Sequence, residues 1–82
     1  MDDRRTNPRM RRLKEGRIIF NGKKSLMSCM VRDVHDGGAR LRIGEPYLVP
    51  NTFHVSIAGE HENRPAERVW MRENEMGIRF RP

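Results

Sequence analysis

The sequence contains little from which an active site or a membrane span could be built. Its 82 residues include a single cysteine, Cys29, so no disulfide can form within the chain, and no CxxC or HxxxH spacing predicts a zinc site. A GxSxG serine elbow and a GxxxxGK phosphate loop are also missing. No apolar run approaches the roughly 18 residues that cross a bilayer, and the N-terminus lacks the apolar segment of a signal peptide. We therefore expect a cytoplasmic protein that is not an enzyme, holds no metal or cofactor, and does not insert into membranes.

Positive charge is what the sequence has in excess. Seventeen Lys and Arg stand against 11 Asp and Glu, a net charge of +6, so an anionic partner is expected. Residues 1–15 concentrate this charge, carry almost no large apolar side chain, and contain Pro8, which discourages a helix. We predict a flexible, arginine-rich arm over residues 1–15, either a solvated tail or a segment that orders on an anionic ligand. Its cationic residues are Arg4, Arg5, Arg9, Arg11, Arg12 and Lys14.

The remainder, residues 16–82, alternates between apolar and polar positions in short runs, which is typical of strands and not of helices. Residues 38–43 (GARLRI), 52–57 (TFHVSI) and 75–80 (EMGIRF) alternate cleanly, and Asn21-Gly22 is a strong turn pair. Counting such runs gives six short strands at the spacing of small barrels, so we predict one all-β domain. We also expect Tyr47, Leu48 and Val49 to tuck under this domain.

The stretch from Arg32 to Ile43 (RDVHDGGARLRI) is where one extended run turns into the next. Gly37 and Gly38 are expected to supply the positive φ angles of the turn, while Asp33 and His35 place polar groups beside bare backbone. Such a turn could approach an anionic or planar ligand. Asp-Gly is also a common hairpin signal, and on this stretch alone a plain hairpin is the favoured interpretation.

Nucleic acid is a less favoured partner. Small basic barrels that bind single strands stack bases on exposed aromatic side chains. Most of the five aromatic residues here fall on positions predicted to face inward, although arginine can also stack on bases. They are Phe20, Tyr47, Phe53, Trp70 and Phe80.

Read together, the arm and the turn resemble the PilZ domain family, whose signature is an RxxxR motif in a flexible N-terminal segment and a D/NxSxxG motif after the second strand. Arg5-Thr6-Asn7-Pro8-Arg9 matches the first motif. The segment from Asp33 to Gly38 matches the second except that His35 stands where the family has serine. The likeness extends over residues 4–80 through the strand order, GARL after the turn, Val69-Trp70 and the closing MGIRF.

This resemblance implies a six-stranded antiparallel β-barrel with a flexible basic N-terminal arm, and it implies a ligand, the bacterial second messenger cyclic di-GMP. By the family motifs, Arg5 and Arg9 would clamp guanine and phosphate, Asp33 would accept hydrogen bonds from a guanine edge, and Gly38 would let the backbone approach the ligand. Arg4 and Arg40 are further candidates, chosen for charge and placement and not from the motifs.

His35 decides the functional interpretation. Imidazole is larger than the serine side chain and, when neutral, donates from only one nitrogen, so we expect binding that is weaker but not abolished. The expected function is that of a receptor and adaptor: the arm changes conformation on ligand binding and signals to an unidentified downstream protein. The alternatives are a degenerate PilZ module that acts only through protein contacts and, less favoured, a nucleic-acid-binding barrel.

Overall fold

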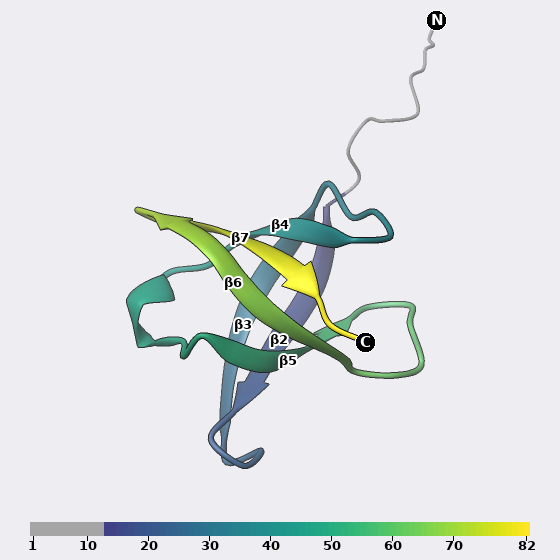
Figure 1. The fold of residues 1–82 in the computed structure, drawn as a ribbon, viewed down its shortest axis with the longest axis horizontal. Coiled ribbons are helices and arrows are strands. Elements are labelled where there is room, and N and C mark those ends of the chain that lie inside the picture. Colours follow the sequence, from purple (N-terminus) through teal and green to yellow (C-terminus); the bar gives the residue numbers. More distant parts are fainter. Residues whose placement is uncertain (1–12) are drawn as a thin grey trace, which may run out of the picture.

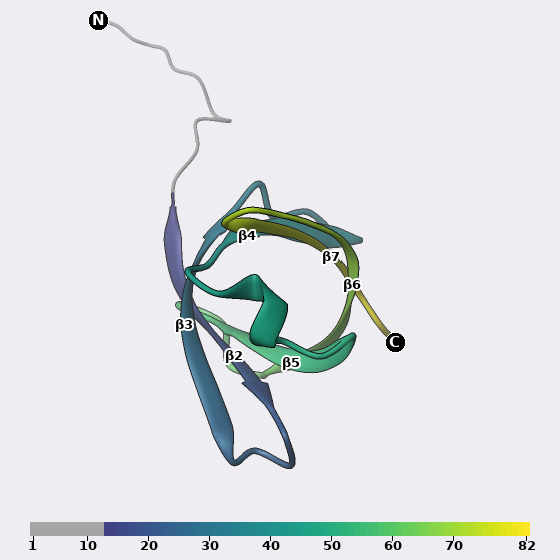
Figure 2. The same cartoon turned by 90° about the vertical axis from the view of Figure 1, so that its left-hand side faces the viewer.

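Alternating apolar side chains close six strands into a barrel (Figures 1 and 2). A computed structural model describes residues 13–82. The six strands and one short 3-10 helix are β2 (Lys14–Phe20), β3 (Ser25–Arg32), β4 (Gly38–Arg42), η1 (Pro46–Leu48), β5 (Thr52–Ile57), β6 (Arg64–Arg72) and β7 (Glu75–Phe80).

The strands pair antiparallel throughout, in the order β2-β3-β4-β7-β6-β5, and β5 returns to β2 to close the barrel. This confirms the predicted all-β, six-stranded antiparallel barrel. Strand β2 begins at Lys14, two positions before the start that the sequence predicted for the barrel domain. The predicted arm otherwise lies outside the described residues, apart from Leu13.

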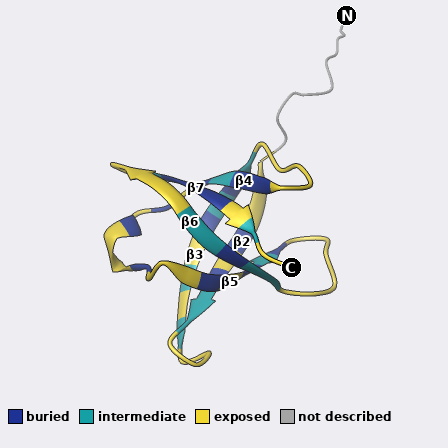
Figure 3. Cartoon of the chain, viewed as in Figure 1, coloured by how far each residue is buried: buried dark blue, intermediate teal, exposed yellow. Residues whose placement is uncertain are grey.

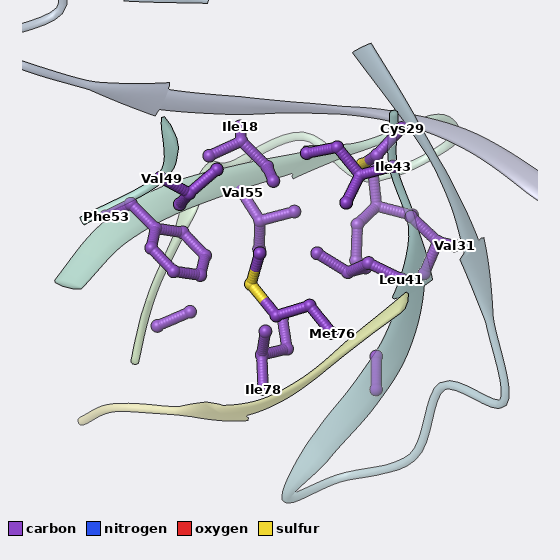
Figure 4. Packing of buried hydrophobic residues seen from close by; sticks show 13 residues of the cluster. Ile18, Cys29, Val31, Leu41, Ile43, Val49, Phe53, Val55, Met76 and Ile78 are labelled. Atoms are coloured by element: carbon purple, nitrogen blue, oxygen red, sulfur yellow. The ribbon is translucent and has the colours of Figure 1, made fainter. Parts of the chain in front are cut away.

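The core is made of inward-facing side chains from every strand (Figure 4). The alternation predicted for residues 38–43 is confirmed, because Ala39, Leu41 and Ile43 are buried while Arg40 and Arg42 face outward. Each large apolar side chain that folding removes from water contributes about 1.5–3 kcal/mol before entropic costs. Ile18, Leu41, Val55, Ala66 and Met76 are fully buried, and the other buried members are Cys29, Val31, Ala39, Ile43, Val49, Phe53, Ile57 and Ile78.

Helix η1 covers one mouth of the barrel, as Figure 2 shows in a view toward that mouth. Pro46 and Val49 are buried there, whereas Tyr47 and Leu48 are 67% and 52% exposed. The expectation that all of Tyr47, Leu48 and Val49 tuck under the domain was therefore wrong for two of them. The reason is helical geometry: a 3-10 turn has three residues, so positions 46 and 49 share the inner side and the two between them face solvent.

The hairpin of β2 and β3 projects beyond the rest of the barrel (Figures 1 and 2). Asn21, Gly22 and Lys23 all have positive φ, at 55°, 63° and 72°, and the Lys24 N–H donates to the Asn21 carbonyl at 3.1 Å. The predicted Asn-Gly turn is confirmed. Both the turn and the outer face of the hairpin are solvent-exposed, with Leu26 at 63% (Figure 3).

Candidate ligand-binding site

The turn between β3 and β4 depends on Asp33 for its unusual backbone geometry. Asp33 has a φ of +49°, whereas neither Gly37 nor Gly38 has a positive φ. The expectation that the paired glycines supply the left-handed conformation was wrong. Aspartate is one of the few side-chain-bearing residues that enter this region readily, because its short polar group can hydrogen-bond locally. The left-handed residue of the turn is therefore Asp33, at the end of β3, while Gly37 takes part in the turn without a positive φ.

Gly38 is required by a close approach between two strands. A Cβ atom added there would lie 2.2 Å from the Ile78 carbonyl oxygen and 3.3 Å from the Cα of Arg79, both on β7. No side chain fits at such distances without moving backbone. The Phe80 N–H also donates to the Gly37 carbonyl at 2.9 Å, which anchors the end of the turn to the same strand. The glycine at this motif position thus serves the packing of β4 on β7.

Asp33 and Arg40 form an ion pair across the turn. Arg40 Nη2 donates to Asp33 Oδ2 at 2.6 Å, and the two side chains are 40% and 49% exposed. At such exposure the pair contributes at most about 1 kcal/mol to folding. Within residues 13–82 no hydrogen bond reaches Oδ1 of Asp33, so that oxygen can accept from a ligand while Oδ2 remains paired.

His35 closes the turn with its ring. Its Nδ1 accepts a hydrogen bond from the Gly37 N–H at 3.1 Å, and its own backbone N–H donates to the Gly38 carbonyl at 2.9 Å. Serine makes the same kind of bond to a backbone N–H two residues ahead, so histidine can replace it in the turn. Because Nδ1 accepts, the neutral ring carries its proton on Nε2, and this nitrogen is the donor that His35 can offer a ligand.

A β-bulge in β6 brings an indole ring to the same region. Arg68 pairs with Ile78 and Trp70 with Gly77, so Val69 is the extra residue. Trp70 lies directly over Gly77, where an added Cβ would be 2.1 Å from the indole Nε1. Trp70 is nevertheless 41% exposed as a residue, so another molecule can reach it.

The turn and the bulge together line an open cleft of about 310 Å³. Asp33, His35 and Arg40 supply its polar groups, and Val69 and Trp70 supply apolar surface. The cleft therefore combines a carboxylate, a guanidinium and an imidazole with one exposed aromatic ring. Such a combination suits a planar, polar ring system that hydrogen-bonds at its edge and stacks on its face.

Of the residues predicted from sequence, the structure brings Asp33, His35 and Arg40 together at this cleft. Gly38 lies in the adjoining strand and packs against β7. Arg4, Arg5 and Arg9 lie outside the described residues.

Sequence reasoning missed Trp70 as a cleft residue. The signal that could have found it is Gly77 inside the alternating run EMGIRF, since a glycine in a strand often marks a close approach by another group.

The described part of the chain adds two further observations. It holds no cluster of three or more His, Cys, Asp or Glu side chains that could bind a metal ion. It also holds no helix that is long and apolar enough to span a bilayer.

Fold and cleft together define a class of protein: a small closed β-barrel with polar side chains gathered at the turn between β3 and β4. Comparison with known families is more specific. A model of the PilZ domain matches residues 3–82, essentially the whole chain, and the chain belongs to the PilZ domain family. PilZ domains are binding and adaptor modules, and theirs is a family of cyclic di-GMP receptors. No curated protein matches the sequence.

Proposed function

We propose that this protein is a cyclic di-GMP receptor whose cleft, lined by Asp33, His35, Arg40 and Trp70, holds one guanine of the ligand. The observation that carries the proposal is that the cleft holds both the exposed residue Trp70 and a carboxylate oxygen of Asp33 that no hydrogen bond from residues 13–82 reaches. Guanine has N–H donors on its Watson–Crick edge, which a carboxylate can accept, and a flat face that an indole can stack on.

The size of the cleft limits how much of the ligand it takes. At about 310 Å³ it is at the lower end of small-molecule sites, enough for a nucleobase and part of its sugar-phosphate. The second guanine and the phosphates would then meet other residues. Arg5 and Arg9 of the RxxxR motif are the proposed contacts, because a guanidinium fork matches both phosphate oxygens and the O6 and N7 acceptors of guanine. The change in the arm on binding would signal to a downstream protein partner.

His35 is proposed to weaken binding without preventing it. Its Nδ1 already bonds to the Gly37 N–H, so only Nε2 is left to donate, while the ring takes more space than serine. Because the turn closes with either residue, His35→Ser is expected to leave the fold intact and to tighten cyclic di-GMP binding.

Isothermal titration calorimetry of the full chain with cyclic di-GMP tests the proposal. Asp33→Asn is the most informative variant, because asparagine keeps the tolerance for positive φ while it removes the charge and replaces one acceptor oxygen with an NH2 donor. We expect saturable heat for the wild type, stronger binding by His35→Ser, and loss of binding in Asp33→Asn and in the double variant Arg5→Ala with Arg9→Ala. Absence of heat at high micromolar ligand for both the wild type and His35→Ser would refute the proposal.

A second candidate function is a PilZ module that binds only protein. It is favoured by the exposed apolar side chains of Val69, Trp70 and Met71, which are 57%, 41% and 43% accessible on neighbouring positions of β6. On this alternative, amide shifts across the chain would not change with cyclic di-GMP.

A further inference from the structure

Strand β3 is longer than the strand that flanks it on one side. On the β2 side it is paired from Ser25 to Val31, but β4 pairs with it only from Met30 to Arg32. Within residues 13–82, the segment from Ser25 to Cys29 therefore has no strand on its β4 side. Figures 1 and 2 agree that this part of the hairpin projects from the barrel. The closed barrel thus retains a short open edge.

The backbone groups of Leu26 and Ser28 face this open side. The Glu15 carbonyl accepts a hydrogen bond from the Ala58 N–H at 2.9 Å, just beyond the end of β5. The backbone groups of the odd-numbered residues of β2 therefore point toward β5. Successive residues in a strand direct their N–H and C=O groups to opposite sides, so the even-numbered residues of β2 bond to odd-numbered residues of β3. The even-numbered residues of β3 then face β4. Beyond the end of β4, no residue among 13–82 pairs with the N–H and C=O groups of Leu26 and Ser28 on this side.

A groove of about 300 Å³ runs along this edge where β4 leaves β3. Ser28 and Met30 form one side, and Arg42, Ile43 and Asn74 form the other. Exposed backbone beside an apolar groove is the arrangement that accepts an extended peptide as an added strand, with backbone bonds giving affinity and the groove holding alternate side chains. Leu26 extends the apolar surface at the outer end of the edge.

Charge indicates the chemistry of the segment that would fit. Among residues 13–82, Arg42 is the one charged side chain that lines the groove, and Glu75, its neighbour on β7, already pairs with Arg32 at 3.2 Å. Lys24 directly precedes β3, at the hairpin end of the edge. On β2, Arg17 lies opposite Ser28 and Glu15 lies opposite Met30. Glu45 and Glu73 flank two of the groove residues, Gly44 and Asn74, but neither lines the groove. Arg42 is therefore the charge that a segment bound in the groove would meet.

A second copy of the chain fits this edge poorly. Antiparallel pairing of two β3 edges about Met27 would satisfy the open groups of Leu26 and Ser28. It would also bring Lys24 of each copy to the position opposite Met30, which Arg42 of the other copy already fills, so the two strands would collide there with like charges together. An acidic segment avoids this repulsion.

We propose that the open edge of β3, centred on Leu26 and Ser28, binds an extended segment of a partner protein that alternates apolar and acidic side chains. The segment adds as an antiparallel strand, its backbone bonds to Leu26 and Ser28, and one of its carboxylates lies against Arg42. This site is separate from the cyclic di-GMP cleft, because the two share no lining residue.

Nuclear magnetic resonance of the full, ¹⁵N-labelled chain tests the proposal with two probes: a short capped peptide of alternating valine and glutamate, and its counterpart with lysine. The glutamate peptide is expected to shift the amides of Leu26 and Ser28 saturably, and the lysine peptide is not. Unshifted edge amides with both peptides, or equal binding of both, would overturn it. Self-association through this edge, seen as concentration-dependent shifts without peptide, would also overturn it in favour of a second copy.

Two variants separate backbone pairing from charge. Ser28→Pro removes an N–H that faces solvent and should weaken the glutamate peptide roughly fivefold, the effect of one lost hydrogen bond. Arg42→Glu should reverse the preference, so that the lysine peptide binds better, and this test stands even if the proline variant fails to fold. Arg81→Glu is the matched control, with the same change of charge at the C-terminal end of the chain. An Arg42→Glu protein that still prefers glutamate would contradict the proposal.

Discussion

Replacing Gly38 with alanine tests whether this motif glycine is needed for the packing of β4 on β7 or for the approach of the ligand. The added Cβ would lie 2.2 Å from the Ile78 carbonyl oxygen, a backbone atom that can move only if β4 and β7 separate. Over-packing of this kind costs about 1–3 kcal/mol. For a domain of this length that lowers the midpoint of thermal unfolding by about 4–8 °C per kcal/mol. We therefore expect Gly38→Ala to be strongly destabilised in thermal and urea unfolding.

Gly44→Ala is the matched control for this measurement. Nothing lies within 4 Å of a Cβ built at Gly44, and its φ is not positive. The substitution should leave stability unchanged or raise it by about 0.4–1 kcal/mol, through the lower entropy of the unfolded chain. If Gly38→Ala unfolds like Gly44→Ala yet loses cyclic di-GMP binding, then the glycine serves ligand approach and our packing argument is refuted.

Three further predictions follow from particular side chains. Gly77→Ala should displace the indole of Trp70, since the new Cβ would be 2.1 Å from Nε1, and the tryptophan emission should shift to longer wavelength; an unchanged spectrum would contradict the stacking. Burial raises the pKa of the Cys29 thiol to about 11, so at pH 8 iodoacetamide should alkylate the native protein on the order of a hundredfold more slowly than the urea-unfolded chain. The hydrogen bond from Arg79, followed by its positive charge, lowers the pKa of Glu67. A carboxylate whose pKa is lower in the folded than in the unfolded state stabilises the fold at pH values above its unfolded pKa, and this stabilisation is lost as pH falls through its folded pKa. Arg79→Ala removes this contribution, so its urea midpoint should decline in acid less steeply than that of the wild type.

The sequence predicted β4, β5 and β7 well because each of these strands alternates between a core and a solvent face. Leu41, Val55 and Met76 all lie where period-two alternation placed them. The exposure of Tyr47 and Leu48 could not be predicted from alternation, because it depends on a 3-10 turn, and the prolines of this loop do not by themselves predict one.

The site was predictable where its residues are close in sequence. Asp33 and His35 belong to one turn, and Arg40 follows a few residues later, so local reasoning grouped them. Trp70 joins them only because the bulge at Val69 and the absence of a side chain at Gly77 set the indole over β7. That placement arises from pairing between β6 and β7 and from the barrel closure that brings β7 beside β4, neither of which a local pattern contains.

The left-handed backbone of Asp33 has a consequence for how the family motif is interpreted. A position that must adopt positive φ favours aspartate, asparagine or glycine whether or not a ligand binds. At Gly38 the nearby Ile78 carbonyl leaves no room for a side chain, which likewise requires glycine without any ligand. Selection for a folded barrel alone is therefore enough to preserve both residues after a lineage has stopped using its nucleotide. Among PilZ domains, this aspartate and this glycine are therefore weak markers of a working receptor when they are taken by themselves.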